Sequence, residues 1–244
     1  MKAVREIVLL ISFAALPVVS FAQSPDPQAA KPSPSPPSQS FRKSLVRDQK
    51  AIWTSPLKLK KEDVRWLLPL TAATTGLIIA DRHTSGWVDR NGDLQPTSHG
   101  VSFVGSAYVV ASTAAGFYLF GHATHNPHTQ QTGELMAEAV IGTAVVTEVL
   151  KFATGRTRPN EALGKGHFFE HGRSFPSGHS SLSWAGATVI AMQYRHNPWI
   201  KYGAFAIAAA IAASRYSGRK HFMSDIVVGS AIGYGIGRFV YNNR

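Results

Sequence analysis

The sequence predicts an all-α protein built as a six-helix bundle. Apolar segments recur between short polar junctions, and they contain much Ala and Gly but few alternating β-branched residues, a composition typical of helices and not of strands. Few charges interrupt them, so we expect the bundle to be membrane-embedded, although several segments are shorter than the roughly 20 residues that cross a bilayer. The six segments are 66–80, 101–121, 135–152, 181–194, 199–213 and 226–240.

The composition limits the classes of protein that the chain can represent. Its 244 residues are enough for one domain with a sizeable core. Lys and Arg number 25 against 14 Asp and Glu, a formal net charge of +11. We therefore expect an anionic partner such as a membrane surface, a nucleic acid or a phosphorylated substrate. Cys is absent, which excludes a disulfide framework, a thiolate metal site and a cysteine nucleophile.

Three N-terminal segments precede the predicted helical domain, which we place at 66–244. Residues 1–22 have a basic start, an apolar run and a small-residue exit, the layout of a secretory signal peptide or, if uncleaved, of an N-terminal anchor. Residues 23–40 are rich in Pro and Ser and predict a linker. Residues 41–65 carry eight cations among apolar side chains, which fits either a basic amphipathic segment on an anionic membrane or a solvated cover of the domain.

The last predicted helix carries a stripe of glycines on one face. Gly229, Gly233 and Gly237 are spaced by four residues, so the backbone of a neighbouring helix can approach closely along this face. Asp225 lies one turn earlier on the same stripe. We therefore expect the stripe to be a packing surface that presses Asp225 into the bundle.

Two cations at the end of the third segment can bind an anion. Lys151 ends the predicted helix, and Arg158 lies seven residues later, before the helix-ending Pro159, so both side chains can point into one pocket. A planar guanidinium matches the geometry of phosphate, and an ammonium adds a point charge. Glu148, one turn before Lys151, either orients that side chain or serves helix packing.

Two further motifs supply a turn, two histidines and a carboxylate. The sequence 176–178, Pro-Ser-Gly, predicts a tight turn before a helix that starts at His179, where backbone N–H groups can hold an anion. His221 and Asp225 are four residues apart, so on one helical face the carboxylate can fix the imidazole tautomer and stabilise its cationic form. Together with the two cations, these groups fit a site for phosphoryl transfer.

Other polar clusters do not predict a metal site. His122, His125 and His128 lie in a loop without carboxylate or Cys companions, which a metal site would need. The acidic segment 89–93 resembles a calcium loop, but glycines stand where an EF-hand requires other residues. We interpret that segment as a turn.

The three phosphate-handling motifs resemble the complete signature of the type-2 phosphatidic acid phosphatase and vanadium haloperoxidase superfamily. No signature position departs from that pattern, which is far more specific than a lone short motif. The resemblance covers the helical layout of residues 66–240, and residues 1–65 lie outside it. The matching residues are Lys151, Arg158 and Pro159; Pro176, Ser177, Gly178 and His179; and Ser214, Arg215, His221 and Asp225.

The resemblance implies a role for each site residue. His221 would attack phosphorus to form a phosphohistidine, His179 would protonate the leaving oxygen and later help to activate water, and Asp225 would orient His221. No metal or other cofactor is implied, because fixed cations neutralise the phosphate. The phosphate-binding set would be Lys151, Arg158, Ser177, Gly178 and Arg215.

From the resemblance we expect a phosphatase of the bacterial cell envelope that hydrolyses a phosphomonoester or the terminal phosphate of a diphosphate on a lipid, and we expect no nucleic-acid partner. A soluble periplasmic acid phosphatase of broad specificity stays an alternative. A vanadium haloperoxidase is less expected because the chain is short beyond the shared bundle, and a non-catalytic anion-binding membrane protein would not need both histidines and Asp225.

The location of the site is the least determined expectation. We favour the inner membrane, because the apolar segments carry few charges, with the site facing the periplasm. The basic segment 41–65 favours that orientation, whereas a translocated N-terminus would place the pocket in the cytoplasm. A soluble form would lie in the periplasm.

Overall fold

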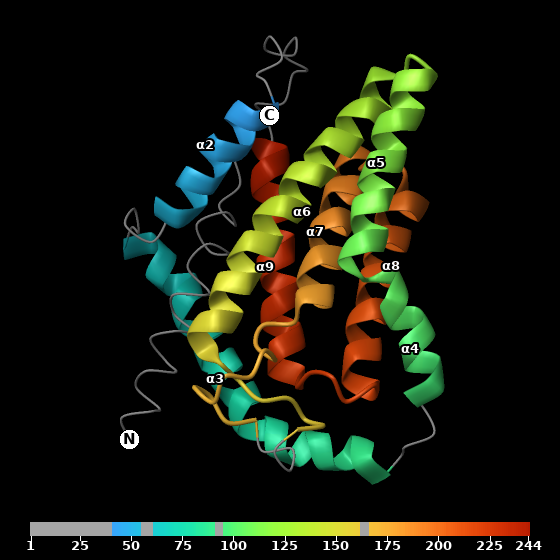
Figure 1. Ribbon diagram of the computed structural model, residues 1–244. Coiled ribbons are helices and arrows are strands. Elements are labelled where there is room, and N and C mark those ends of the chain that lie inside the picture. Colours follow the sequence, from blue (N-terminus) through green and yellow to red (C-terminus); the bar gives the residue numbers. More distant parts are fainter. Residues whose placement is uncertain (1–40, 55–60, 91–94, 162–165) are drawn as a thin grey trace.

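The computed structural model describes residues 41–54, 61–90, 95–161 and 166–244. All regular secondary structure in these residues is helical, which confirms the predicted all-α class. The expected signal peptide and linker lie outside the described residues. The helices are α2 (Phe41–Thr54), α3 (Lys61–Arg90), α4 (Gln95–Val104), α5 (Ala107–Ala123), α6 (Pro127–Thr154), α7 (Gly178–Gln193), α8 (Pro198–Ser217) and α9 (Met223–Asn242) (Figure 1).

The bundle is built around α6, α7 and α9. α7 packs against both α6 and α9, α5 packs on α6, and α8 packs on α7 (Figure 1). α2 lies along α6, and α3 passes across the lower end of the bundle, where it contacts α9. The fully buried core side chains between the central helices include Ala139, Val189, Ile232 and Ile236.

The predicted helix at 101–121 is interrupted, and this part of the prediction was wrong. α4 ends at Val104 and α5 begins at Ala107, after Ser106, whose side chain accepts a hydrogen bond from the Val109 N–H. A Cβ at Gly105 would overlap the side chain of Ile211 on α8. The close approach of α8 therefore occupies the space that a side chain at this junction would need.

Local sequence explains how α6 and α8 begin. Asn126 and Asn197 each precede a proline at the first helical position, and each asparagine side chain accepts a hydrogen bond from an N–H of the first turn. α6 ends at Thr154, and the residue that follows it, Gly155, has a φ of 53°. Glycine adopts this left-handed conformation without steric cost, so the chain can leave α6 sharply after its last turn.

The glycine stripe of α9 packs against the start of α7, as predicted. A Cβ at Gly229 would lie 2.6 Å from the Ser177 carbonyl oxygen, and one at Gly233 would overlap the Ser181 carbonyl oxygen. The N–H of Ser177 donates to the backbone oxygen of Asp225 over 2.9 Å. The side chain of Asp225 is fully buried, so the stripe brings that carboxylate beside the turn that precedes α7.

No helix in the described part of the chain is both long enough and apolar enough to cross a membrane. Large apolar side chains are nevertheless exposed on the surface of several helices. On α5, α6 and α8 they include Tyr108, Leu119, Phe120, Val149, Phe152, Trp199, Tyr202 and Ile207.

Candidate active site

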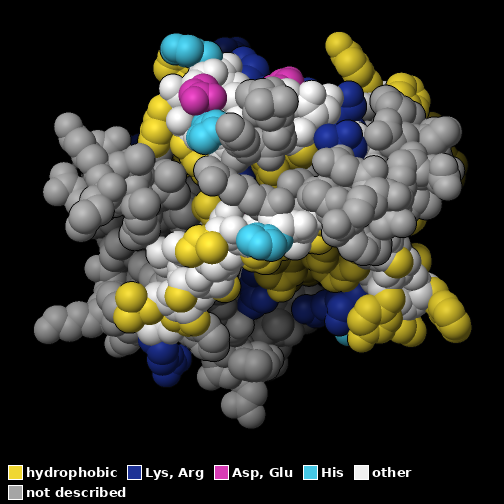
Figure 2. All heavy atoms as spheres, turned by 90° about the horizontal axis from the view of Figure 1, so that it is seen from below, with side chains coloured by type: hydrophobic (Ala, Val, Ile, Leu, Met, Phe, Trp, Pro, Cys, Tyr) yellow, Lys and Arg dark blue, Asp and Glu magenta, His cyan; other side chains and the backbone are white. Residues whose placement is uncertain are grey.

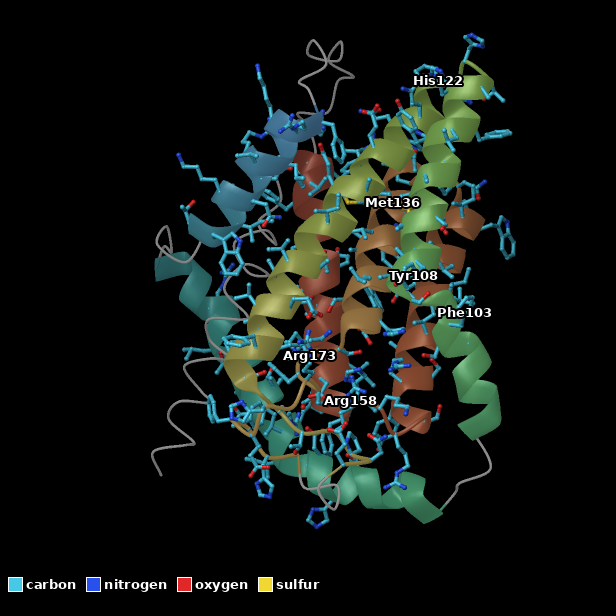
Figure 3. All side chains as sticks on the ribbon, in the orientation of Figure 1. Phe103, Tyr108, His122, Met136, Arg158 and Arg173 are labelled. Atoms are coloured by element: carbon cyan, nitrogen blue, oxygen red, sulfur yellow. The ribbon has the colours of Figure 1, made fainter. Side chains whose placement is uncertain are left out.

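The predicted motifs meet at the lower end of the bundle. α6 and α8 end there, and α7 and α9 begin there. Side chains at this end include Arg158 and Arg173, whereas His122 lies at the opposite end (Figure 3). Seen from below, dark blue Lys and Arg side chains appear between yellow hydrophobic ones (Figure 2). Cations are therefore present at the face to which the motifs converge.

His179 lies at the centre of these charges. Burial and the surrounding charges lower the pKa of His179 from its ordinary 6.5 to about 4, so the imidazole is neutral at pH 7. The neighbouring groups that lower it are, in decreasing order, Arg215, His221, Lys151 and Arg158. Five predicted site residues from three motifs therefore share one small volume.

Lys151 lies directly above the beginning of α7. A Cβ at Gly178 would lie 2.9 Å from the Nζ atom of Lys151. The first N–H groups of a helix have no partner within the helix, so the ammonium and the N-terminus of α7 can act on the same anion. Ser177 is fully buried, and its Oγ accepts a hydrogen bond from Ser180 Oγ over 3.1 Å.

Arg215 is a half-buried guanidinium with spare donor capacity. Its Nη1 donates to Ser102 Oγ on α4, but its buried Nε has no hydrogen-bond partner among the described residues. Burial, followed by the charge of Arg158, lowers the pKa of Arg215 to about 10. A buried N–H without an acceptor is costly, and an anion at this point would satisfy it.

His221 is buried and held by a backbone carbonyl. Its Nδ1 lies 2.8 Å from the carbonyl oxygen of Ser174, whereas Asp225 Oδ2 is 3.6 Å away, beyond hydrogen-bond range. Because a carbonyl oxygen only accepts, Nδ1 carries the proton and Nε2 keeps its lone pair. Burial lowers the pKa of His221 by more than the nearby Asp225 carboxylate raises it. The ring is therefore neutral.

Asp225 acts on His221 through Ser174, whereas the sequence predicted a direct contact on one helical face. The two residues do not share a helical face, because α9 begins at Met223 and His221 lies in the turn before it. Asp225 Oδ2 accepts from the Phe222 N–H at 2.9 Å and from Ser174 Oγ at 2.5 Å. The carboxylate thus fixes Ser174, and the carbonyl of that residue fixes the imidazole.

Arg156 completes this arrangement, and the sequence analysis missed it. Its guanidinium is almost fully buried and donates to Asp225 Oδ1 at 2.6 Å and to Asp81 Oδ2 at 2.8 Å. Phe168 and Phe222 lie 4.7 and 4.2 Å from its guanidinium carbon, within the range of cation–π contacts. One buried cation therefore connects α3, α9 and the loop after α6.

The two carboxylates that flank Arg156 have opposite pKa shifts. Burial raises the pKa of Asp81, and Arg156 only partly offsets this. Burial would also raise the pKa of Asp225, but Arg156 and the hydrogen bonds from its neighbours hold it below its ordinary range. Asp225 therefore stays ionised next to the site. Ser224 joins the two acids through bonds to Asp81 and Arg156.

Comparison with known proteins identifies the family to which the C-terminal part of the chain is similar. Residues 135–244 match the sequence model of the PAP2 superfamily. Residues 135–244 belong to the PAP2 superfamily. This match confirms the resemblance seen in the three motifs, and the PAP2 segment contains all eight predicted site residues. Asp81 and Ser102 lie outside it, so α3 and α4 supply contacts to the PAP2 site from elsewhere in the chain.

The proteins similar to this chain include two curated relatives from eukaryotes. A PA-phosphatase related-family protein of Dictyostelium discoideum is 35% identical over 144 residues, or 52% of this chain and 52% of that protein. Lipid phosphate phosphatase 1 of Arabidopsis thaliana is 30% identical over 157 residues, or 51% of this chain and 47% of that protein. The chain thus spans about half the length of these curated relatives.

The PAP2 fold is also found by structural comparison. The crystal structure of a transmembrane PAP2 type phosphatidylglycerolphosphate phosphatase from Bacillus subtilis gives a TM-score of 0.55 at 20% identity. The match covers 84% of this chain and 94% of that chain. The likeness extends the fold assignment to helices outside the PAP2 segment.

The three histidines predicted in one loop lie away from the PAP2 site, and the loop assignment was wrong for two of them: His122 is in the last turn of α5 and His128 is in the first turn of α6. The ring of His128 packs edge-on against Tyr194, and its Nε2 lies 3.1 Å from the backbone carbonyl oxygen of Gln193. No group of three or more His, Cys, Asp or Glu side chains in the described residues is arranged to hold a metal ion.

Proposed function

We propose that the chain is a phosphatase that hydrolyses a phosphomonoester, or the terminal phosphate of a diphosphate, on a lipid through a phosphohistidine intermediate. The observation that carries the proposal is the state of His221. Its Nδ1–H is held by the Ser174 carbonyl, so the Nε2 lone pair is available, and the charges of Arg215 and Arg158 act on the same ring. A positioned neutral imidazole of this kind can act as a nucleophile towards phosphorus.

Binding uses charges that are already in place. The phosphate dianion lies between Lys151, Arg158 and Arg215, with the Gly178 N–H and the N-terminus of α7 beneath it. Arg215 Nε, buried without a partner among the described residues, donates to one phosphate oxygen. Because these groups need little rearrangement, they stabilise the charge that is spread over the equatorial oxygens in the transition state.

The first chemical step transfers the phosphoryl group to His221. Nε2 attacks phosphorus, the bond from phosphorus to the leaving oxygen breaks, and His179 gives its proton to that oxygen. In the second step His179 takes a proton from water, whose oxygen attacks phosphorus. The phosphorus–nitrogen bond breaks, inorganic phosphate leaves, and His221 returns to its neutral form.

The low pKa of His179 fits this cycle once the substrate is included. Without a bound anion, burial and the surrounding charges hold its pKa near 4. A bound phosphate dianion neutralises those cations, so the pKa of His179 rises and the ring can carry the proton that the leaving oxygen requires. The substrate itself therefore prepares the general acid.

A lipid substrate is supported by the apolar surface beside the site. Phe152 follows Lys151 on α6 and is 90% exposed, so an apolar ring projects to solvent from the helix end that carries a phosphate-binding cation. Exposed apolar side chains continue along α5, α6 and α8. Surfaces of this kind in soluble monomers are small, and larger ones mark contact with membranes or proteins. We place the protein at a membrane of the cell envelope.

Phosphate release and trapping of the intermediate test the proposal. The detergent-extracted protein is assayed on a lipid phosphate in micelles and on p-nitrophenyl phosphate, and a labelled substrate is quenched in alkali to retain phosphohistidine. The unchanged chain should release phosphate from the lipid and retain label, and His221→Ala should do neither while keeping its helical circular dichroism. Near-normal turnover by folded His221→Ala contradicts the proposed mechanism.

The same preparation distinguishes the other functions. Turnover of p-nitrophenyl phosphate but not of the lipid, by protein in the soluble fraction, would identify a soluble acid phosphatase. Halide oxidation that depends on added vanadate would identify a haloperoxidase. Phosphate binding without turnover of either ester would identify an anion-binding protein.

A further inference from the structure

A single carboxylate joins a phosphate-binding cation to an exposed arginine that has no assigned role. Glu148 Oε1 accepts a hydrogen bond from Lys151 Nζ at 2.6 Å, and its Oε2 accepts one from Arg173 Nη2. Burial would raise the pKa of Glu148, but the two cations hold it below its ordinary range, so the group is ionised. The two cations are therefore separated by the width of one carboxylate.

Arg173 lies on a fixed stretch of backbone. The N–H of Gly172 donates to the Gly155 carbonyl at 2.9 Å, and the N–H of Ser174 donates to the Arg156 carbonyl at 2.8 Å. The chain on both sides of Arg173 is thus tied to the segment that follows α6. Its side chain is 63% exposed, so the guanidinium is presented to solvent at the edge of the site (Figure 3).

Glu148 and a bound phosphate compete for the same cation. A phosphate dianion at Lys151 repels the Glu148 carboxylate, and it also replaces that carboxylate as the acceptor for Nζ. Glu148 is 48% exposed and can rotate towards water at little cost. Arg173 then faces the position that the carboxylate has left, next to the bound phosphate.

We propose that Arg173 binds a second anionic group of the substrate, adjacent to the phosphate that is cleaved, at the position that the Glu148 carboxylate occupies between Lys151 and Arg173. This proposal rests on the proposed function and narrows its substrate class to molecules such as diphosphate esters. A guanidinium suits this role because its fork can bind two oxygens of one anionic group. Lys151 contacts both groups, because it lies between Glu148 and the start of α7.

Binding of two matched ligands tests the assignment without turnover. Methylphosphonate carries one phosphoryl group, and methylenediphosphonate carries two in a form that cannot be hydrolysed at its bridge. Their affinities are measured by calorimetry on the full chain, on Arg173→Gln, and on Arg195→Gln, which removes an exposed arginine between α7 and α8 at the other end of the bundle. Arg173→Gln should weaken methylenediphosphonate about tenfold, the effect of losing one charged hydrogen bond, and methylphosphonate less than about twofold.

Each outcome bears on the proposal. The second site is overturned if Arg173→Gln weakens both ligands equally or weakens neither. It is also overturned if Arg195→Gln weakens methylenediphosphonate as much as Arg173→Gln does. Glu148→Gln should bind methylenediphosphonate at least as tightly as the unchanged chain, because the competing charge is gone, and a loss would contradict the shared position. Failure of methylphosphonate to bind the unchanged chain would instead contradict the phosphate site itself, and with it the proposed function.

Discussion

Arg156 donates a 2.6 Å hydrogen bond to Asp225, and both side chains are buried at the base of the site. The same guanidinium binds Asp81 on α3. Asp225 in turn holds Ser174, whose carbonyl accepts the Nδ1–H of His221. Arg156 is therefore a positioning residue that acts on the nucleophile through Asp225 and Ser174.

Replacing Arg156 should affect both stability and the state of His221. Arg156→Gln leaves two buried carboxylates without their cation, which should destabilise the fold by about 3–5 kcal/mol, measured by urea unfolding. In the folded fraction, the freed Asp225 should raise the pKa of His221, which histidine ring nitrogen NMR shifts report. Asp81→Asn keeps the cation with Asp225 and should leave the His221 pKa in place. A stability loss with no change in that pKa would assign Arg156 a structural role only.

The sequence predicted the helical segments and the motif residues because both are local patterns. Apolar runs and fixed residue spacings can be recognised in the sequence without knowing which residues they contact in the fold. It could not predict that Arg156 would meet Asp81, which is 75 residues away, directly after the apolar segment 66–80 and outside any motif. A buried arginine needs an acid, but the sequence offers several, and only the crossing of α3 under the bundle selects one.

Two other differences between the predicted and the observed structure also arise from contacts between distant parts of the chain. The break after α4 depends on Ile211 of α8, which approaches Gly105 from a distant part of the chain. The partner of His221 is a backbone carbonyl, and the direction of the carbonyl of Ser174 is set by the path of a loop. The spacing of His221 and Asp225 correctly predicted that the two residues lie near each other. The Nδ1–H of His221 nevertheless donates to the Ser174 carbonyl and not to the Asp225 carboxylate.

Protonation of His179 should couple folding to pH. Its pKa of about 4 in the folded protein is below the ordinary 6.5, so the unfolded chain binds more protons between these values. The free energy of unfolding should therefore fall as the pH decreases through this window and should be insensitive to His179 above it. Urea midpoints of the unchanged chain and of His179→Asn, compared along the pH series, measure the contribution. Parallel curves for the two proteins would contradict the low pKa.

Anion binding should take up a proton at the same histidine. Sulfate is a tetrahedral dianion that does not titrate in this range, and its charge should raise the pKa of His179 by offsetting Lys151, Arg158 and Arg215. At about pH 5, above the pKa of about 4 that His179 has without the anion, binding should be accompanied by proton uptake. Calorimetry in two buffers of different ionisation enthalpy measures it. His179→Asn should abolish the uptake, and uptake that persists in this variant would assign the proton to another group.

The contact of α7 with α9 should tolerate no side chain at the centre of the glycine stripe. Gly233→Ala places a Cβ against the Ser181 carbonyl oxygen, so the helices must separate and the fold should lose about 1–3 kcal/mol. Gly203→Ala is the matched control, because its Cβ would meet no atom within 4 Å on α8. That change should stabilise the protein by up to about 1 kcal/mol through helix propensity. Equal stabilities of the two variants would contradict close packing along the stripe.

Phe152 should matter for lipid substrates and not for small ones. Its ring is 90% exposed beside Lys151, where an acyl chain attached to a bound phosphate would contact it, and burying such a ring contributes about 1.5–3 kcal/mol. Phe152→Gln should therefore raise the KM for a lipid phosphate in micelles about tenfold, with kcat and the hydrolysis of p-nitrophenyl phosphate unchanged.

Phe120→Gln controls for a general loss of apolar surface, because Phe120 is 64% exposed on α5, near the end that carries His122. Its KM for the micellar lipid should stay close to that of the unchanged chain if Phe152 contacts the substrate itself. If the two variants raise KM equally, the apolar surface acts through general attachment to the micelle. If neither does, the lipid chain leaves the site in another direction, since the position of Lys151 fixes only the phosphate end of the substrate.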